Sequence, residues 1–485
     1  MTWEGAFVAS QERLMAARAR PAGRTPGPVV VALVMAVLAA SLAQTIVLAV
    51  LPRFAAGLDA STTEVTWVLT AFMLSSAVAT PIAGRLGDLA GYRRVLVGCL
   101  CCFTAGSLVC ALAGGSLGVL IAGRALQGVA GGVFPLSFGI ARTAVPPARL
   151  PGIIALLSAM FGIGGSAGMV VAGPLVDVLG TSSLFWGTLV LGGAALAAVP
   201  ALPRVRPSRG GRLDLGGAVL LSGALVCLLL AISQGRPWGW GSAAVAGLFA
   251  GGAVLLAAFG VLESRIADPL VDLRLMGRRG QATTNLATFV VAMAMFGAIT
   301  LVPRFVQAPA AGYGFGSSPS EAGLIMLPMA LVMLVAGPAA ARLGDRRGGR
   351  TPLLAGAVCA AVSLAVLAAA HGHLVNFYLV GLLIGAGYGL AFAAMGLLIV
   401  QSAPAHQTGV ATGINTIVRT VAAAIGAQLA AVLLEARTPA GGPLPDESGY
   451  TLGFTVFAVL GVAAIAAGAL VPGRSAGRPG DQAGA

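Results

Sequence analysis

GRLGDLAGYRR at residues 84–94 returns as ARLGDRRGGR at residues 341–350. The two aspartates, Asp88 and Asp345, are 257 residues apart, and the same interval separates Gly152 from Gly409. Each copy is a short charged break between long apolar runs. The chain is therefore expected to contain two copies of one unit in the same orientation.

The composition around these breaks excludes a water-soluble protein. Of the 485 residues, 58% are hydrophobic and only 9% are charged, and the mean hydropathy is +0.94. Soluble domains carry roughly a quarter charged residues, and a membrane-spanning helix needs about 20 apolar residues. The predicted class is an all-α polytopic membrane protein.

Apolar runs between charged or Gly/Pro-rich breaks predict fourteen transmembrane helices. Six precede an accessory pair and six follow it, so the even-numbered insertion preserves the orientation of the two repeats. Two parallel six-helix repeats are an architecture of transporters, with the substrate path between the halves. The spans are expected near 28–52, 64–84, 94–114, 117–140, 151–176, 182–202, 215–233, 241–262, 281–303, 320–341, 351–370, 376–400, 407–434 and 451–471.

The spans divide the chain into five parts. The expected parts are a cytoplasmic N-terminal segment (1–27), a first six-helix bundle (28–202), two accessory helices with cytoplasmic flanks (203–280), a second bundle (281–472) and a cytoplasmic tail (473–485).

The basic residues predict the orientation in the membrane. All 29 are arginine, and with a cytoplasmic N-terminus 23 fall on the cytoplasmic side against four outside. Such a bias is the positive-inside signal of an inner, plasma-membrane protein with both termini in the cytoplasm. Because these arginines lie in short gaps rather than on one face, the net charge of +13 does not indicate nucleic-acid binding.

The repeated loop is expected to act as a gate. Gly87 and Gly91 permit a tight turn between two spans, and Asp88 can accept hydrogen bonds from the amides of a helix N-terminus or from Arg93 and Arg94. A carboxylate paired at a helix junction can hold one conformation and be released in another. The predicted gating residues are Gly84, Gly87, Asp88, Gly91, Arg93, Arg94, Gly344, Asp345 and Arg350.

The sequence resembles the major facilitator superfamily, and within it the fourteen-span drug:proton antiporters. Residues 84–94 look like the signature loop of that family, Arg124 to Gly128 looks like its second motif, and residues 164–174 are similar to its antiporter motif. The resemblance covers about residues 28–472. It implies export of small molecules driven by the proton gradient, with no cofactor and no metal. It also implies a proton-coupling role for Arg124 and a cytoplasm-sealing helix that carries Gly164, Gly168, Gly173 and Pro174.

One departure from the family affects the substrate. Many relatives carry an aspartate in the first span where this chain has Ala43, and no carboxylate lies in the middle of any expected span. The polar inventory of the spans is neutral to positive, so a lipophilic neutral or anionic substrate is favoured over a dication. For Arg419, bonding to carbonyls and a substrate role both satisfy a buried charge. The expected substrate and proton pathway comprises Gln44, Thr45, Trp67, Arg124, Gln127, Asn285, Asn415, Thr416 and Arg419.

The sequence also bears on functions other than export. An uptake symporter, an uncoupled transporter and a sensor of the same fold all remain open, because no central acid is visible. A membrane-embedded enzyme is disfavoured, since the three histidines pair with no cysteine or acid at catalytic or metal-ligand spacing. ATP-driven transport by this chain alone is excluded because a chain without lysine has no phosphate-binding P-loop. The expected partners are a small molecule, protons and the lipid bilayer, and the expected state is a monomer.

Overall fold

The computed structural model describes residues 26–473 except 59, 61, 205–213, 267–268, 311, 405–406 and 440–444. Most of residues 1–27 and of 473–485, predicted to be cytoplasmic, lie outside this part. The described residues form helices without any strand. A helix satisfies each backbone N–H and C=O within the segment itself, as the interior of a bilayer favours for long apolar runs.

The first half of the chain contains short and long helices. Their bounds are α2 (Pro26–Thr45), η1 (Leu48–Val50), α3 (Leu51–Gly57), α4 (Thr62–Leu86), η2 (Gly87–Gly91), α5 (Tyr92–Ala111), α6 (Leu117–Gly128), η3 (Val129–Gly132), α7 (Val133–Ala144), α8 (Leu150–Leu179), α9 (Ser183–Ala198) and η4 (Val199–Ala201).

The remaining helices include the accessory pair, α10 and α11, and the second bundle. Their bounds are α10 (Leu215–Trp238), α11 (Ala243–Glu263), α12 (Leu273–Gly277), α13 (Arg279–Gln307), α14 (Pro319–Arg347), α15 (Arg350–Ala369), α16 (Leu374–Ser402), α17 (Thr408–Glu435) and α18 (Glu447–Leu470).

Local sequence signals account for several helix ends. Ser318 and Glu321 form a capping box at the start of α14, in which each side chain accepts a hydrogen bond from the backbone N–H of the other residue. The equivalent box in the first repeat includes Ser61, which lies outside the described residues. Gly91 has φ 96°, a conformation that favours glycine, and it separates η2 from α5.

Twelve helical stretches among the described residues are long and apolar enough to cross a membrane, or thirteen if the bent α8 is included. One of the twelve runs from Glu64 to Ala111 and contains both α4 and α5, which the sequence predicts as separate spans. The chain is therefore an integral membrane protein, and the exact number of fourteen stays a prediction.

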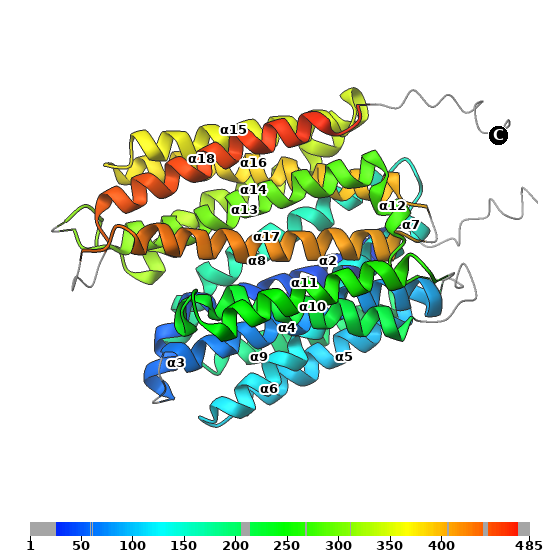
Figure 1. Ribbon diagram of the computed structural model, residues 1–485, viewed down its shortest axis with the longest axis horizontal. Coiled ribbons are helices and arrows are strands. Elements are labelled where there is room, and N and C mark those ends of the chain that lie inside the picture. Colours follow the sequence, from blue (N-terminus) through cyan, green and yellow to red (C-terminus); the bar gives the residue numbers. More distant parts are fainter. Residues whose placement is uncertain are drawn as a thin grey trace, which may run out of the picture.

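Two separate sets of apolar residues form the cores of the two bundles. One core comes from α13 to α18, and the cores of the first half are built mainly from α2 to α9. In Figure 1 these bundles form two layers, with the later, yellow to red helices above the blue and cyan ones. The halves meet where α8 contacts α14 and α16, and where α17 contacts α4 and α7.

The accessory helix α10 lies against both bundles. It contacts α4 of the first and α17 of the second, and the green α10–α11 pair lies next to the orange α17 in Figure 1. A shared apolar cluster joins Leu221 and Leu225 of α10 with Ala77 of α4 and Ile414 of α17. The insertion therefore covers one of the two seams between the halves.

Candidate functional site

A cavity lies between the two bundles, on the side of α10. It has a volume of about 240 Å³ and is lined from α2, α4, α8, α10, α13 and α17. Its walls are mostly apolar with scattered hydroxyl and amide groups, and no lining residue is charged. Such a surface suits a lipophilic molecule oriented by a few hydrogen bonds. The polar lining residues are Ser41, Gln44, Thr45, Thr66, Thr70, Ser233, Thr300 and Gln428.

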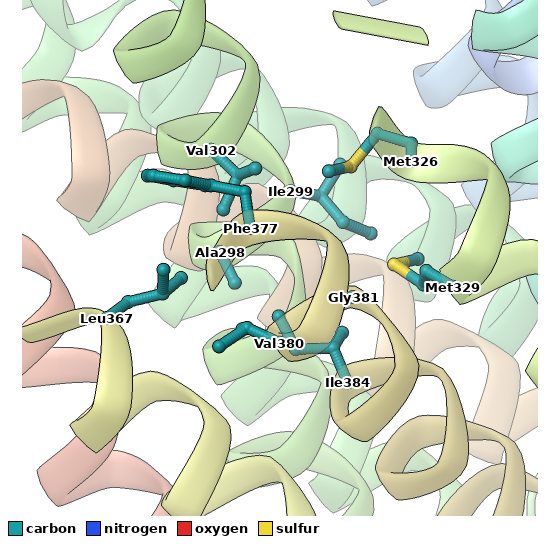
Figure 2. Close-up of a pocket in the computed structure, with 10 residues that line it drawn as sticks. All are labelled: Ala298, Ile299, Val302, Met326, Met329, Leu367, Phe377, Val380, Gly381 and Ile384. Carbon is teal, nitrogen blue, oxygen red and sulfur yellow. The ribbon is translucent and has the colours of Figure 1, made fainter. Parts of the chain in front are cut away.

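A second gap, drawn in Figure 2, belongs to the interior of the C-terminal bundle. Figure 2 shows apolar side chains such as Phe377, Met326 and Met329 converging on it. Its volume is about 10 Å³, room for no more than about one water molecule, and no polar side chain lines it. It is a packing gap within one bundle rather than a substrate site.

Arg419 is not itself a lining residue of the cavity between the bundles, but it stacks on one. It is 5% exposed, and its guanidinium stands 3.9 Å from the ring centroid of Phe161, which lines the cavity. Phe134 and Phe392 face the same guanidinium at 5.3 and 5.7 Å. Its Nε and Nη2 have no hydrogen-bond partner among the described residues. Three aromatic faces stabilise the cation, and two of its three nitrogens have hydrogen-bond donors that no described residue uses.

Of the residues predicted to line the pathway, Gln44 and Thr45 line this cavity. Thr45 also donates a hydrogen bond to the carbonyl of Gly165 across the α2–α8 contact, at 2.7 Å. Trp67 is half-buried on α4 and is not a lining residue. Nor do Arg124, Gln127, Asn285, Asn415 and Thr416 line the cavity in this conformation.

Arg124 is instead enclosed in the first bundle, with no exposed surface. It donates to the carbonyl oxygens of Val68 (3.1 Å) and Ala43 (3.0 Å) and to Oε1 of Gln127 (2.8 Å). Gln127 in turn donates to the hydroxyls of Ser107 and Thr188 at 2.7 and 3.3 Å. The backbone carbonyl of Ala43 thus accepts from the arginine in the first span. This network ties α2, α4, α5 and α9 to α6.

Arg124→Ala is expected to destabilise the first bundle by about 3 kcal/mol, because hydrogen bonds to charged groups contribute about 1.5–3 kcal/mol each. The substitution would also leave Oε1 of Gln127 without the donor that Arg124 provides. Thermal unfolding of the purified protein measures this loss, with Arg278→Ala, at an exposed arginine, as control. Equal stability of the two variants would contradict a structural role for the network.

Asn285 and Asn415 form an analogous tie in the second bundle. The Asn415 amide donates to Oδ1 of Asn285 and to the hydroxyl of Thr288, each at 2.9 Å. The three groups join α13 to α17 and are buried. In this conformation their side chains hydrogen-bond to one another and do not line the cavity.

At the end of the bundle away from the cavity, Asp88 joins the two halves. Its Oδ1 and Oδ2 accept hydrogen bonds from the backbone N–H groups of Gly409 (3.1 Å) and Val410 (3.2 Å). These amides belong to the first turn of α17, where the helix dipole favours a negative charge. The hydroxyl of Tyr92 also donates to Oδ1. We call this arrangement of Asp88, Gly409 and Val410 the Asp88 latch.

Glycines allow the close approach that the latch requires. A Cβ at Gly84 or at Gly409 would collide with backbone atoms of the other residue, and one at Gly87 would collide with Leu136 and Tyr92. Arg93 is half-buried and Arg94 is exposed. Of the two kinds of donor expected for Asp88, the structure shows helix amides.

Gly84→Ala is expected to force α4 and α17 apart, because backbone atoms cannot move aside as a flexible side chain can. Transport should fall about tenfold, as a strain of about 1–3 kcal/mol would produce. Gly98→Ala on α5, where nothing lies within 4 Å of the added carbon, is the matched control. Transport by both variants at the wild-type rate would show that the contact is dispensable.

Arg142 makes a second connection between the halves at this end. Its Nη1 donates to the carbonyl oxygens of Val400 and Ala403 and to the hydroxyl of Thr408, at 2.6 to 2.8 Å. The acceptors lie at the end of α16 and the start of α17. The sequence indicates only that Arg142 is one of many orientation arginines, so its partners were not foreseen.

The second copy of the loop is arranged differently. Asp345 is exposed on the last turn of α14, Gly344 is half-buried, and Arg350 begins α15. Gly152, which corresponds to Gly409 in the repeat, has nothing within 4 Å of an added Cβ. The two halves are therefore not equivalent here, and the close backbone contact is made by the first copy.

The predicted antiporter-motif helix is α8. Gly164 and Gly168 face α2, where a Cβ would collide with Ser41 and with Thr45 respectively. The segments Leu150–Gly165 and Val170–Leu179 are inclined by 45°. Gly173 and Pro174 lie in the second segment, and Pro174 removes the hydrogen bond to Val170, at the start of that segment. Small residues thus allow close packing, and the bend lies one turn before the proline.

The comparisons with known proteins agree with this architecture. The family model of the Major Facilitator Superfamily matches residues 33–427 and 284–484. The chain belongs to this superfamily. A crystal structure of a human organic anion transporter has the same fold, with a TM-score of 0.66 and 18% identity over 92% of this chain and all of that one.

Curated superfamily relatives give more detail. The chain is 30% identical over 433 residues to the tetracenomycin C resistance and export protein of Streptomyces glaucescens, covering 87% of this chain and 78% of that protein. It is 35% identical over 394 residues to an uncharacterized transporter of Mycobacterium tuberculosis, covering 79% of this chain. The chain spans about half of the length of that relative, 55%.

Proposed function

We propose that this superfamily member exports a lipophilic small molecule, neutral or anionic, by alternating access driven by the proton gradient. The observation that carries the proposal is Arg419, a buried cation stacked on Phe161 in the wall of the apolar cavity between the halves. Its Nε and Nη2 have no hydrogen-bond partner in the part of the chain that the structure describes. The export and resistance function named for the Streptomyces relative supports the direction of transport.

Burial explains why Arg419 would recognise an anion. A charge in a low-dielectric site is costly unless it is paired, and aromatic faces supply only part of the compensation. A carboxylate, phenolate or sulfonate on the substrate would complete it, while the apolar walls hold the rest of the molecule. A neutral substrate could use the same N–H groups through a carbonyl oxygen.

In the proposed cycle the halves rock about this cavity. We place the end with the Asp88 latch at the cytoplasm, and the arginine bias of the loops supports this orientation. The latch and Arg142 then close the cytoplasmic side in the present conformation, and both must break for substrate to enter from the cell. The protein is placed in the inner membrane as a monomer, with both termini in the cytoplasm.

Cells that lack their own efflux pumps and express the chain test this proposal. Loaded with a fluorescent lipophilic anion, they should lose it faster than cells with an empty vector, and an uncoupler should abolish the difference. Faster accumulation instead would identify an uptake symporter. If the protein is present in the membrane and expressing cells retain both anionic and neutral probes as well as empty-vector cells do, export is contradicted.

A further inference from the structure

Two carboxylates meet where the accessory helices begin and end. Asp214 precedes α10 and Glu263 is the last residue of α11. A Cβ at Gly217 would come within 3.0 Å of both Asp214 Oδ2 and Glu263 Oε1, so these oxygens are less than 6 Å apart. Charged oxygens at this separation disfavour each other's ionisation.

Within the described ranges, neither of the two facing oxygens has a hydrogen-bond donor. Asp214 Oδ1 accepts from the Gly217 amide at 2.9 Å, as the N-cap of α10, and Glu263 Oε2 accepts from the Val271 amide at 3.3 Å. Asp214 Oδ2 and Glu263 Oε1 are buried without a partner among the described residues. Glu263 as a whole is only 4% exposed. Both residues thus direct a buried acceptor oxygen toward the space beside Gly217.

We propose that Asp214 and Glu263 share one proton and form a proton-binding site at the base of the accessory pair. One carboxylate oxygen takes the proton and forms an O–H bond, which donates a hydrogen bond to the opposite oxygen. A single proton therefore removes one of two like charges and supplies the donor that both acceptors lack. Release of the proton to water leaves both groups ionised.

Arg85 connects this site to the gate. Among the described residues, Arg85 is a nearby positive charge for both Glu263 and Asp88. It lies in the last turn of α4, three residues before Asp88, and its buried Nε has no hydrogen-bond partner in the described part of the chain. Proton release would place a second negative charge near Arg85, drawing this cation toward the pair. The site needs no transport to exist, whereas its link to the gate rests on the proposed function.

Infrared spectroscopy of the purified full-length protein tests the shared proton directly. At neutral pH the wild type should show the C=O stretch of a protonated carboxylic acid, and Glu263→Gln should lack it. Asp214→Asn should lack the band too. The amide oxygen of the asparagine can still cap α10, and its N–H can donate a hydrogen bond to Glu263, which then needs no proton. Asp272→Asn, at a carboxylate that accepts bonds from the amides of Arg274 and Leu275, should retain it. A band unchanged in both pair variants, each folded, would overturn the proposal.

Proteoliposomes then test the link to transport. With the membrane potential held at zero, one proton per substrate across a pH difference of about one unit sustains about a tenfold substrate gradient. Glu263→Gln should lose this uphill accumulation while substrate counterflow, which needs no net proton movement, continues. If Glu263→Gln accumulated substrate uphill as well as the wild type, the carboxylate pair would have no part in proton coupling. Absence of counterflow in the wild type would instead count against the proposed function and leave the infrared result to decide the proton site.

Discussion

Replacing Asp88 with asparagine is expected to open the cytoplasmic end of the protein and to reduce transport strongly. The substitution keeps the shape of the side chain but removes the charge that the N-terminus of α17 attracts. Charge-assisted hydrogen bonds contribute about 1.5–3 kcal/mol each, so a loss of about 2 kcal/mol would shift the balance between closed and open states about 30-fold.

Pulsed electron paramagnetic resonance measures this shift between closed and open states. Spin labels at the exposed positions Ala90 and Gln401, one in each half and both at the latch end, should report a longer distance in Asp88→Asn than in the parent. Asp345→Asn, the same change at the exposed second copy, serves as the control and should leave the distances as they are. Identical distributions and transport rates for Asp88→Asn and the parent would refute the latch.

Replacing Arg419 with glutamine is expected to abolish transport of anionic compounds selectively. Losing one partner of a buried charge pair costs about 2–5 kcal/mol, so transport of anions should fall about 100-fold. The transport rate of neutral compounds should fall far less, since glutamine can still donate N–H hydrogen bonds. The comparison uses initial transport rates for matched neutral and anionic compounds, with Arg278→Gln as the control for net charge.

The pattern of loss distinguishes the roles of this residue. Equal reductions for neutral and anionic compounds would indicate that Arg419 supports the helix packing or the conformational cycle rather than the substrate. No reduction for either class would remove it from the site altogether. Lower thermal stability without a change in selectivity would favour the structural alternative that the sequence left open.

The fold could be predicted largely because its signals are local. Apolar runs, the capping box at Ser318 and Glu321, and the repeated loop each report on a few neighbouring residues. The superfamily assignment is confirmed by the family model. The side of the membrane that each loop faces stays a prediction based on the arginines.

The site could be predicted only in part, because its geometry depends on contacts between distant segments. Gly409 lies 321 residues from Asp88, and nothing in the repeated loop indicates that the first copy is buried while Asp345 is exposed. Arg124 was expected to face the cavity, yet backbone carbonyls of two other helices surround it. Polar residues within spans satisfy one another as readily as they line a path.

The accessory pair shows the same limit more sharply. Its sequence predicts two apolar spans and nothing more, but Leu229, Ile232 and Ser233 of α10 line the cavity. Asp214 and Glu263 read as ordinary charges at the ends of spans. Their pairing depends on the hairpin of α10 and α11, which brings residues 49 positions apart in sequence to the same side of Gly217.

Inside-out vesicles that contain the protein test proton-coupled export most directly. With an acid interior imposed, a panel of anionic, neutral and cationic lipophilic compounds is added and the internal pH is followed. Anionic or neutral compounds should collapse the gradient, dicationic compounds should not, and Arg419→Gln should remove the response to anions. A response confined to dications, or none to any compound in folded protein, would contradict the proposed export.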